Sequence, residues 1–199
     1  MINRHIRTLT VLAAFLAGLV LSLGVILIVR DHVSAPGAPA TAAIGGPFRL
    51  TDQDGRVMTE ADLKGRPSLV FFGFTHCPDV CPTTLFDISQ VMTALGPDAD
   101  RTRAVFITVD PERDTQSVLK DYLTSFDPHV TGLTGDLPAI TTVAKEYRVY
   151  FKKVPLDGGG YTMDHTAITY LMDKEGRFVS PFSLKRTPEA AAADLRRQL

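Results

Sequence analysis

The apolar run SLVFFGF, at positions 68–74, leads directly into a segment that holds both cysteines of the chain, Cys77 and Cys81. A continuous apolar run between turn signals is typical of a strand that is buried on both faces of a sheet. Behind the cysteines, apolar residues recur at helical spacing until Gly96 and Pro97, which predict the end of a helix. The two thiols therefore fall between a central strand and its helix, where α/β folds place their functional sites.

Strand and helix signals alternate along the rest of the domain. FRLTDQDGRVMT carries a D-G turn between two short strands, and AVFITVD at 104–110 is a second buried strand. Apolar spacing predicts a helix after Asp114, its expected N-cap, and a third helix over 140–147. The strands AITYLMD and RFVSPF and the helix TPEAAAADLRRQL close the chain. This order predicts an α/β sandwich with a mixed central sheet, and the cysteine position makes it thioredoxin-like.

An apolar segment near the N-terminus is long enough to cross a membrane. No charge falls between Leu9 and Val29, a stretch of 21 residues. At about 1.5 Å per residue, this stretch spans the ~30 Å hydrocarbon layer. Arg4 and Arg7 precede it, whereas Arg30 behind it is followed at once by an acidic residue. The positive-inside bias therefore predicts a cytoplasmic N-terminus.

We expect four parts: a cytoplasmic N-terminus at 1–8, a transmembrane anchor at 9–30, a flexible tether at 31–47 and a domain at 48–199. A signal peptide cleaved near Ala38 is the alternative, but the apolar regions of signal peptides usually run only about 7–15 residues. Too few residues precede the apolar segment for a transit peptide. We therefore predict a single-pass protein of a bacterial inner membrane, with its domain in the periplasm.

The charge of the domain bears on its partners. From position 31 onward there are 18 Lys and Arg against 22 Asp and Glu, a net charge of −4. A mildly acidic domain without a basic stripe is a poor match for nucleic acid. We expect no nucleic-acid partner.

The loop CPDVCP sets the two thiols four positions apart. A thiol at a helix N-terminus is favoured as thiolate by the helix dipole, although Pro82 predicts a constrained loop that is only partly helical. The pair can close a disulfide or face one metal ion. A purely structural disulfide is disfavoured, because so short a loop gives the least chain-entropy stabilisation. Redox or metal chemistry is therefore the better interpretation.

His165 supplies a third donor for a metal ion. It lies just before an apolar strand and after a glycine-rich loop at 158–160. Alone it would be an ordinary core or surface residue. Together with Cys77 and Cys81 it makes a soft three-ligand set, which suits copper(I), and its imidazole also suits copper(II). We interpret Met163, two positions earlier, as a packing residue, and expect the side chain of His76 to point away from that of Cys77.

Asp110, in the motif VDPERDT, follows the second buried strand, so its turn should lie beside the cysteine loop. Its carboxylate can orient a metal ligand from outside the coordination shell. It can equally serve as an ordinary Asp-Pro turn former. The sequence leaves both interpretations open.

Other chemistries fit less well. In the peroxidase pattern P-x-x-x-T-x-x-C the threonine stands three residues before the reactive cysteine, whereas Thr75 stands two before Cys77 and Val70 takes the place of the proline. A thioredoxin-type reductase normally carries C-x-x-C without a distant histidine ligand. A structural zinc site would need four closed ligands.

The motifs GFTHCPDVCPTTL, ITVDPERDT and DHTAITYLMD, in this order behind one N-terminal anchor, resemble the Sco/SenC family over essentially the whole domain. The resemblance implies a thioredoxin-like fold and copper ligands at Cys77, Cys81 and His165. It implies a metallochaperone rather than an enzyme, which delivers copper to the dinuclear copper centre of cytochrome c oxidase. The expected partners are the copper-bearing subunit of that oxidase, an upstream copper donor protein and the inner membrane.

The same resemblance implies an alternative function. Members of the family also show thiol-disulfide reductase behaviour toward the cysteines of the oxidase copper centre. A membrane-tethered thiol-disulfide oxidoreductase, acting through a redox-active Cys77–Cys81 pair, is therefore the second interpretation.

Overall fold

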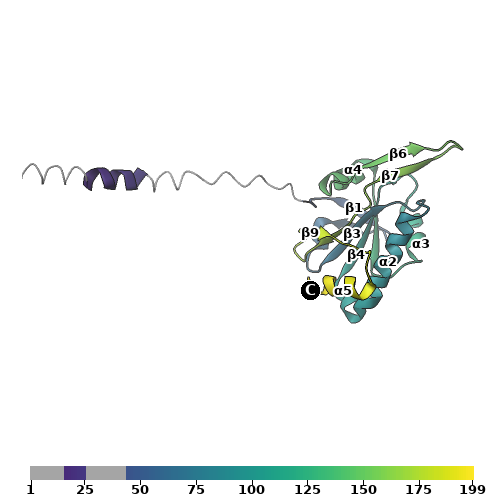
Figure 1. The fold of residues 1–199 in the computed structure, drawn as a ribbon. Coiled ribbons are helices and arrows are strands. Elements are labelled where there is room, and N and C mark those ends of the chain that lie inside the picture. The colour runs from purple at the N-terminus through teal and green to yellow at the C-terminus, as the bar shows by residue number, and fades with distance from the viewer. Residues whose placement is uncertain (1–15, 26–43) are drawn as a thin grey trace, which may run out of the picture. The chain divides into compact units, whose positions relative to one another are not determined.

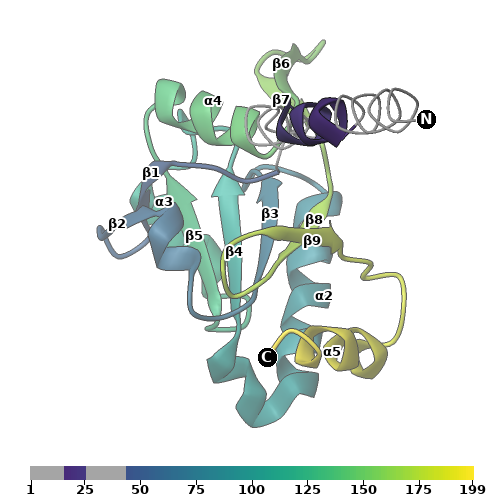
Figure 2. The ribbon, with the colours of Figure 1, turned by 90° about the vertical axis from the view of Figure 1, so that its left-hand side faces the viewer.

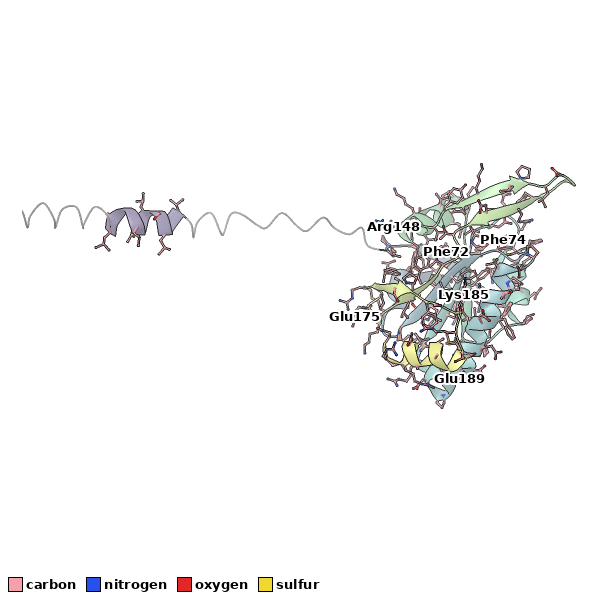
Figure 3. The ribbon with its side chains drawn as sticks, in the orientation of Figure 1. Phe72, Phe74, Arg148, Glu175, Lys185 and Glu189 are labelled. Carbon is pink, nitrogen blue, oxygen red and sulfur yellow. The ribbon has the colours of Figure 1, made fainter. Side chains whose placement is uncertain are left out.

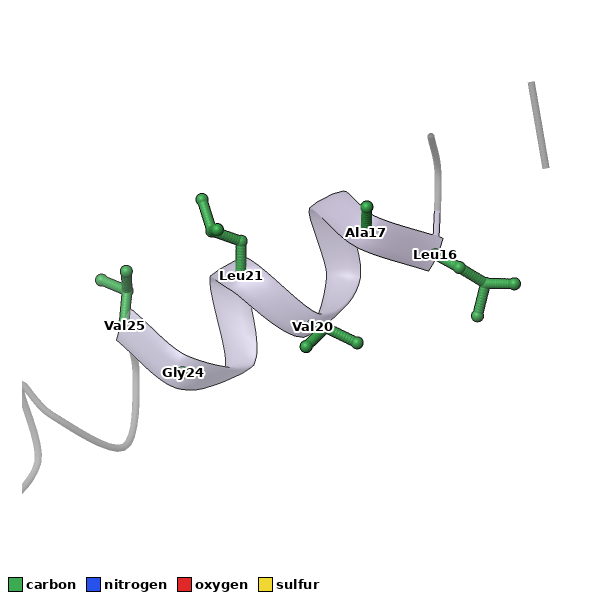
Figure 4. A pocket seen from close by; sticks show the side chains of 6 residues that line it. All are labelled: Leu16, Ala17, Val20, Leu21, Gly24 and Val25. Atoms are coloured by element: carbon green, nitrogen blue, oxygen red, sulfur yellow. The ribbon is translucent and has the colours of Figure 1, made fainter. Parts of the chain in front are cut away.

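The computed structural model describes residues 16–25 and 44–199, which belong to two separate compact units. Residues 16–25 form a helix with an exposed apolar surface. The residues that line this surface in Figure 4 are Leu16, Ala17, Val20, Leu21, Gly24 and Val25. Within the two described ranges, no helix is both long and apolar enough to cross a membrane. The remainder of the predicted anchor, and most of the predicted tether, lie outside the described residues.

A mixed sheet of seven strands forms the centre of residues 44–199, in the order β2-β1-β5-β4-β3-β8-β9 (Figures 1 and 2). The three middle strands β5, β4 and β3 are parallel, whereas β1 and β8 run antiparallel to their neighbours β5 and β3. This arrangement confirms the predicted mixed sheet. The strands are β1 (Arg49–Asp52), β2 (Val57–Thr59), β3 (Ser68–Gly73), β4 (Arg103–Thr108), β5 (Val130–Thr134), β8 (Thr169–Met172) and β9 (Phe178–Pro181).

Helices connect and cover these strands. They are α2 (Val80–Leu95), α3 (Gln116–Leu123), α4 (Leu137–Glu146) and α5 (Pro188–Arg196), with short 3-10 helices at Glu60–Leu63 and Gly96–Arg101. The helices α2 and α5 lie side by side in both views, and α3 packs on β5 (Figures 1 and 2). The units β3–α2–β4 and β4–α3–β5 each join two parallel neighbouring strands, and both step across the sheet in the same direction. Because such connections are right-handed, α2 and α3 lie on the same face of the sheet.

Aromatic side chains show that both faces of the sheet are covered. Phe71 stacks on Phe106, which in turn contacts Tyr122 of α3. The next residue along β3, Phe72, points to the opposite face and packs against Tyr147 at the end of α4. All six residues of β3 are buried as a result, as its unbroken apolar run predicts.

The strands β6 (Phe151–Pro155) and β7 (Tyr161–His165) form a separate two-stranded antiparallel sheet within the described part of the chain. This hairpin extends away from the seven-stranded sheet in Figure 1. Residues 156–160 connect its two strands, and within this connection Gly159 and Gly160 adopt φ values of 88° and 78°, a region that favours glycine. His165 is the last residue of β7.

The predicted N-cap of α3 is wrong. Thr115, not Asp114, caps the helix by accepting a hydrogen bond from the amide of Val118. The carboxylate of Asp114 is buried instead, where it accepts hydrogen bonds from Thr75 and Thr108. Threonine can serve as an N-cap nearly as well as aspartate, so the buried donors decide which of the two residues turns inward.

Candidate metal centre

Both cysteines lie where β3 passes into α2. Cys77 is in the connecting loop and its amide donates to the carbonyl of Phe74, at 3.3 Å. Cys81 is the second residue of α2 and is fully buried, whereas Cys77 is partly exposed. The loop CPDVCP is partly helical, as expected: the helix begins at Val80, and residues 77–79 lie outside it. Pro82 is tolerated in the first turn because the first amides of a helix have no intrahelical partner to lose.

Both thiols are free, and they are close to one another. The backbone amide of Cys81 lies 3.4 Å from the Sγ of Cys77 and donates to it. The first turn of α2 therefore directs an N–H group, and with it the positive end of the helix dipole, at the Cys77 sulfur.

His165 meets the second cysteine from across the domain. Its Nε2 lies 3.7 Å from the Sγ of Cys81, and its Nδ1 lies 3.1 Å from the carbonyl oxygen of Thr166. A proton on Nδ1 satisfies that carbonyl and leaves the lone pair of Nε2 directed at the thiol, which is the orientation of a metal ligand. Burial lowers the pKa of His165, so the imidazole is held in the neutral form that binds metals.

The spacing of this pair fits a shared metal ion. With the bond lengths of zinc, about 2.3 Å to sulfur and about 2.0–2.1 Å to imidazole nitrogen, bond angles of roughly 110–120° place the two atoms about 3.5–3.8 Å apart. Within residues 16–25 and 44–199, no three His, Cys, Asp or Glu side chains are already gathered around one metal position. The structure therefore brings Cys81 and His165 together, and Cys77 must turn toward them to complete the predicted set.

A cleft of about 270 Å³ connects the solvent to this place. One wall is the cysteine loop with Phe74 and Cys77, and the other is the end of β7 with His165. The rings of Phe74 and His165 meet edge to face with their centroids 5.7 Å apart, and Phe74 is labelled in Figure 3. Met163 also lines the cleft but is buried in the core, in agreement with a packing role.

The surroundings of Cys81 disfavour its thiolate form. Burial raises the pKa of the Cys81 thiol well above its ordinary value, and the neighbouring Cys77 adds to this effect. Cys81 therefore carries its proton at neutral pH in the metal-free protein. A thiophilic metal has to displace that proton, so metal binding releases it to solvent.

Asp110 closes the turn after β4 and also reaches the β6–β7 hairpin. Its carbonyl oxygen accepts the amides of Arg113 and Asp114, at 3.2 and 2.9 Å, as expected of a turn former. Its buried carboxylate accepts a hydrogen bond of 2.8 Å from the Tyr161 hydroxyl and forms an ion pair with Arg113. The carboxylate thus contacts the first residue of β7, the strand that ends at His165.

Two further histidines of the domain pair with other groups. The side chain of His76 is 53% exposed, and its Nδ1 lies 3.1 Å from the Thr75 hydroxyl and 3.9 Å from the Asp114 carboxylate. His129 is paired with Asp127 and Asp100 through distances of 2.6 and 3.1 Å.

Sequence reasoning missed three contributors to this site. Asp114 fixes the cysteine loop by accepting hydrogen bonds from the amide and hydroxyl of Thr75, at 2.9 and 2.6 Å. Gly73 leaves the space that the Cys81 sulfur occupies. Tyr161 connects the hairpin to Asp110. The repeated Asp in VDPERDT was the one available signal, because the other two contacts depend on how distant segments pack.

The fold and site define a class: thioredoxin-like proteins with a C-x-x-x-C pair at a helix start and a distant histidine beside the second cysteine. A family model for SCO1/SenC matches residues 36–199, and the chain belongs to that family.

Relatives and solved structures agree with this assignment. The chain is 43% identical to a SCO2-like protein of Rickettsia prowazekii over 143 residues, which are 71% of this chain and 70% of the relative. It is similar to a structure of Bradyrhizobium japonicum ScoI with copper bound, at 66% identity and a TM-score of 0.77, over 79% of this chain and 100% of that one. It is also similar to yeast Sco1 with copper bound, at 37% identity and a TM-score of 0.71, over 78% of this chain and 87% of that one.

Proposed function

We propose that this chain is a copper metallochaperone, which holds copper through Cys77, Cys81 and His165 and assists assembly of the dinuclear copper centre of cytochrome c oxidase. The observation that carries the proposal is the distance of 3.7 Å between the Nε2 of His165 and the Sγ of Cys81. The Sγ of Cys77 is also near, 3.4 Å from the backbone amide of Cys81. Similar structures that contain copper support the choice of metal.

The chemistry of the donor set supports copper as cargo. Two sulfurs and one imidazole form a soft set that suits copper(I), and the imidazole also accepts copper(II). The partly exposed Cys77 is the donor that an arriving ion meets first. The buried Cys81 and His165 then take the ion away from solvent, and the proton of Cys81 leaves.

The same asymmetry suits delivery. A cargo ion has to be transferred by exchange of ligands, so one ligand must be reachable by the acceptor. Cys77 lines the open cleft, and a partner's sulfur or imidazole can replace it while Cys81 and His165 still hold the ion. The copper-bearing subunit of the oxidase as acceptor, and an upstream donor protein, come from the family resemblance.

A membrane anchor at 9–30, with the domain in the periplasm of a bacterium, is part of the proposal. It is supported by the uncharged apolar segment and by the charges on either side of it. A C-terminal reporter enzyme that is active only outside the cytoplasm tests the topology, and osmotic shock tests the anchor. An inactive reporter on a fusion protein that is made in normal amount, or release of the intact protein by shock, would contradict this part.

Thiol-disulfide exchange is the second candidate function, favoured by the closeness of two free thiols. Cys77 would attack the disulfide of a partner and Cys81 would resolve the mixed disulfide. The partner then gains two thiols and this chain is left with a Cys77–Cys81 disulfide. A closed disulfide cannot bind copper, so the two activities exclude each other at any one moment.

Replacement of His165 separates the two functions, because imidazole is needed for copper but not for electron exchange between cysteines. Under the copper function, His165→Ala reduces copper retention and causes an oxidase-assembly defect close to that of Cys81→Ala. Under thiol exchange, Cys81→Ala is defective and His165→Ala is nearly normal. Cells are compared at limiting copper, since added copper can mask a weak chaperone.

His76→Ala is the matched control, because it removes an exposed histidine that is next to Cys77 in sequence but is not a proposed copper ligand. Normal oxidase activity in a His165→Ala strain at limiting copper, together with measured loss of copper binding by the purified protein, would refute the chaperone function.

A further inference from the structure

We propose that Asp110, Arg113 and Tyr161 form a positioning unit that sets the place of His165 at Cys81. The unit joins the turn after β4 to the start of β7, and none of its members is a proposed copper ligand. The choice of copper as the metal rests on the proposed function above. The position of His165 is independent of that function, because it can be measured in the metal-free protein.

The three side chains are connected by directed contacts. The Tyr161 hydroxyl donates to one oxygen of the Asp110 carboxylate at 2.8 Å, and the Arg113 side chain pairs with the other oxygen. Arg113 also donates to the carbonyl oxygen of Tyr161 at 3.0 Å, and its guanidinium lies 3.9 Å from the centre of the Tyr161 ring. Both the backbone and the side chain of Tyr161 are therefore held.

The unit acts on His165 by two routes. Tyr161 and His165 are the first and last residues of β7, so fixing the start of this short strand fixes where its end lies. The Arg113 guanidinium also lies 5.9 Å from the centre of the Phe74 ring, and Phe74 meets the His165 ring edge to face. The imidazole is thus supported through its own strand and through the ring beside it.

The separation of the hairpin from the main sheet gives this support its importance. Within the described residues, β7 pairs only with β6, so the ladder of the seven-stranded sheet does not hold it in register. The side chains of Asp110 and Arg113 are 0% and 24% exposed, so the contacts that dock the hairpin are shielded from water. A shielded, charge-assisted contact fixes geometry better than an exposed one.

Arg113 has features that lysine cannot supply. Its planar group stacks on an aromatic ring while bonding a carboxylate and a carbonyl at the same time. Its second terminal nitrogen, Nη2, is buried without a hydrogen-bond partner among the described residues. An unpaired buried donor is costly, so the stack and the two bonds that Arg113 does make have to offset that cost.

The test compares Tyr161→Phe with Tyr150→Phe in the full-length protein. Tyr161→Phe removes the hydroxyl bound to Asp110 and keeps the ring. Tyr150→Phe makes the same chemical change just before the hairpin, where the side chain is largely exposed. In the metal-free protein, NMR contacts between the rings of His165 and Phe74 report the place of the imidazole. Copper(I) affinity is measured by competition with a chromophoric chelator, and the copper(II) visible spectrum reports the ligand geometry.

We expect Tyr161→Phe to weaken the His165–Phe74 contacts, change the copper(II) spectrum and reduce copper affinity by about 10–100-fold, as loss of an outer partner of a metal ligand typically does. Tyr150→Phe should match the unmodified protein in all three measurements. Urea denaturation should show Tyr161→Phe to be folded. If it does not fold, Arg113→Lys undergoes the same measurements.

Two results would overturn the proposal. One is a Tyr161→Phe protein whose ring contacts and copper affinity equal those of the unmodified protein. The other is reduced copper affinity with unchanged ring contacts, which would mean that the hydroxyl acts in another way. Failure of the unmodified protein to bind copper would refute the proposed function, while the ring contacts would still decide the positioning role.

Discussion

Gly73 lies directly beneath Cys81: a Cβ atom added to Gly73 would come within 2.8 Å of the Cys81 sulfur and 2.7 Å of a ring carbon of Phe106. The last residue of β3 therefore has to be glycine for reasons of space. The buried cysteine occupies the volume that any side chain would need. This relation ties the end of the central strand to the metal centre.

Replacement of Gly73 should disturb the site and the fold together. We expect Gly73→Ala to lower the free energy of unfolding by about 1–3 kcal/mol, because the added methyl overpacks the core and displaces either Cys81 or the strand. Urea denaturation measures the loss of stability. Labelling of Cys81 by a thiol reagent, which should become faster, measures the displacement.

Gly158→Ala is the control for this change. No atom lies within 4 Å of a Cβ added there, and its backbone is outside the region that favours glycine. It should leave both stability and labelling unaltered. Equal stability of the Gly73→Ala and Gly158→Ala proteins would show that the packing beneath Cys81 is not tight.

The two cysteines should differ in reactivity. Cys77 is partly exposed and receives an amide hydrogen bond, whereas burial raises the pKa of the Cys81 thiol. In the reduced native protein, iodoacetamide should therefore modify Cys77 at least about ten times faster than Cys81, since the thiolate is the reactive form. Mass spectrometry of the labelled peptide at successive times measures both rates. The two rates should become similar in urea, and faster labelling of Cys81 in the folded protein would contradict the structure.

Loss of the buried Asp114 carboxylate should release the cysteine loop. Asp114→Ala leaves the Thr75 amide and the hydroxyls of Thr75 and Thr108 without their acceptor, so it should cost roughly 3 kcal/mol or more of unfolding free energy. Asp114→Asn keeps one oxygen for the amide and should cost clearly less. Urea denaturation ranks the three proteins, and an alanine variant as stable as the asparagine variant would exclude this role.

His129 should make a pH-dependent contribution to stability. Burial alone would lower its pKa, but the hydrogen bonds and charges of Asp100 and Asp127 outweigh burial, and the pKa is raised above 6.5. A raised folded-state pKa stabilises the protein below the unfolded pKa, and this stabilisation is lost as pH rises through the folded pKa. The difference in unfolding free energy between the unmodified protein and His129→Gln should therefore be larger at pH 5.5 than at pH 8.5. A difference that grows with pH would show that the aspartates do not stabilise the protonated ring.

Local sequence patterns predicted the strands and helices well, because the spacing of apolar residues depends on which faces of a strand or helix are buried. The run at 68–74 and the helical spacing after Cys81 indicate how many faces of an element are covered, and the structure confirms both. The thiols could be located for the same reason, since the order of strand and helix places them. The part played by Tyr161 could not be predicted, because its partner Asp110 is 51 positions away and depends on the docking of a hairpin.

The error at Asp114 has a comparable origin. The N-cap rule considers only the residues next to a helix, and it ranks Asp and Thr almost equally. What distinguishes Asp114 from Thr115 is the set of donors on β4 and on the cysteine loop. Competition between a local and a distant partner is not visible in a single sequence.

The central position of β3 also determines how the chain reaches its native state. One neighbour of β3 is β8, and this pairing joins residues 100 positions apart, such as Val70 and Tyr170. Contacts between segments so far apart slow folding, because the entropy of closing the loop is lost before the contact forms. Until β8 arrives, the hydrogen-bonding edge of a strand that is apolar on both faces stays open to other chains. The docking of β8 therefore controls how long a newly made chain is exposed to aggregation, and the cysteine loop directly after β3 is exposed to oxidants for the same interval.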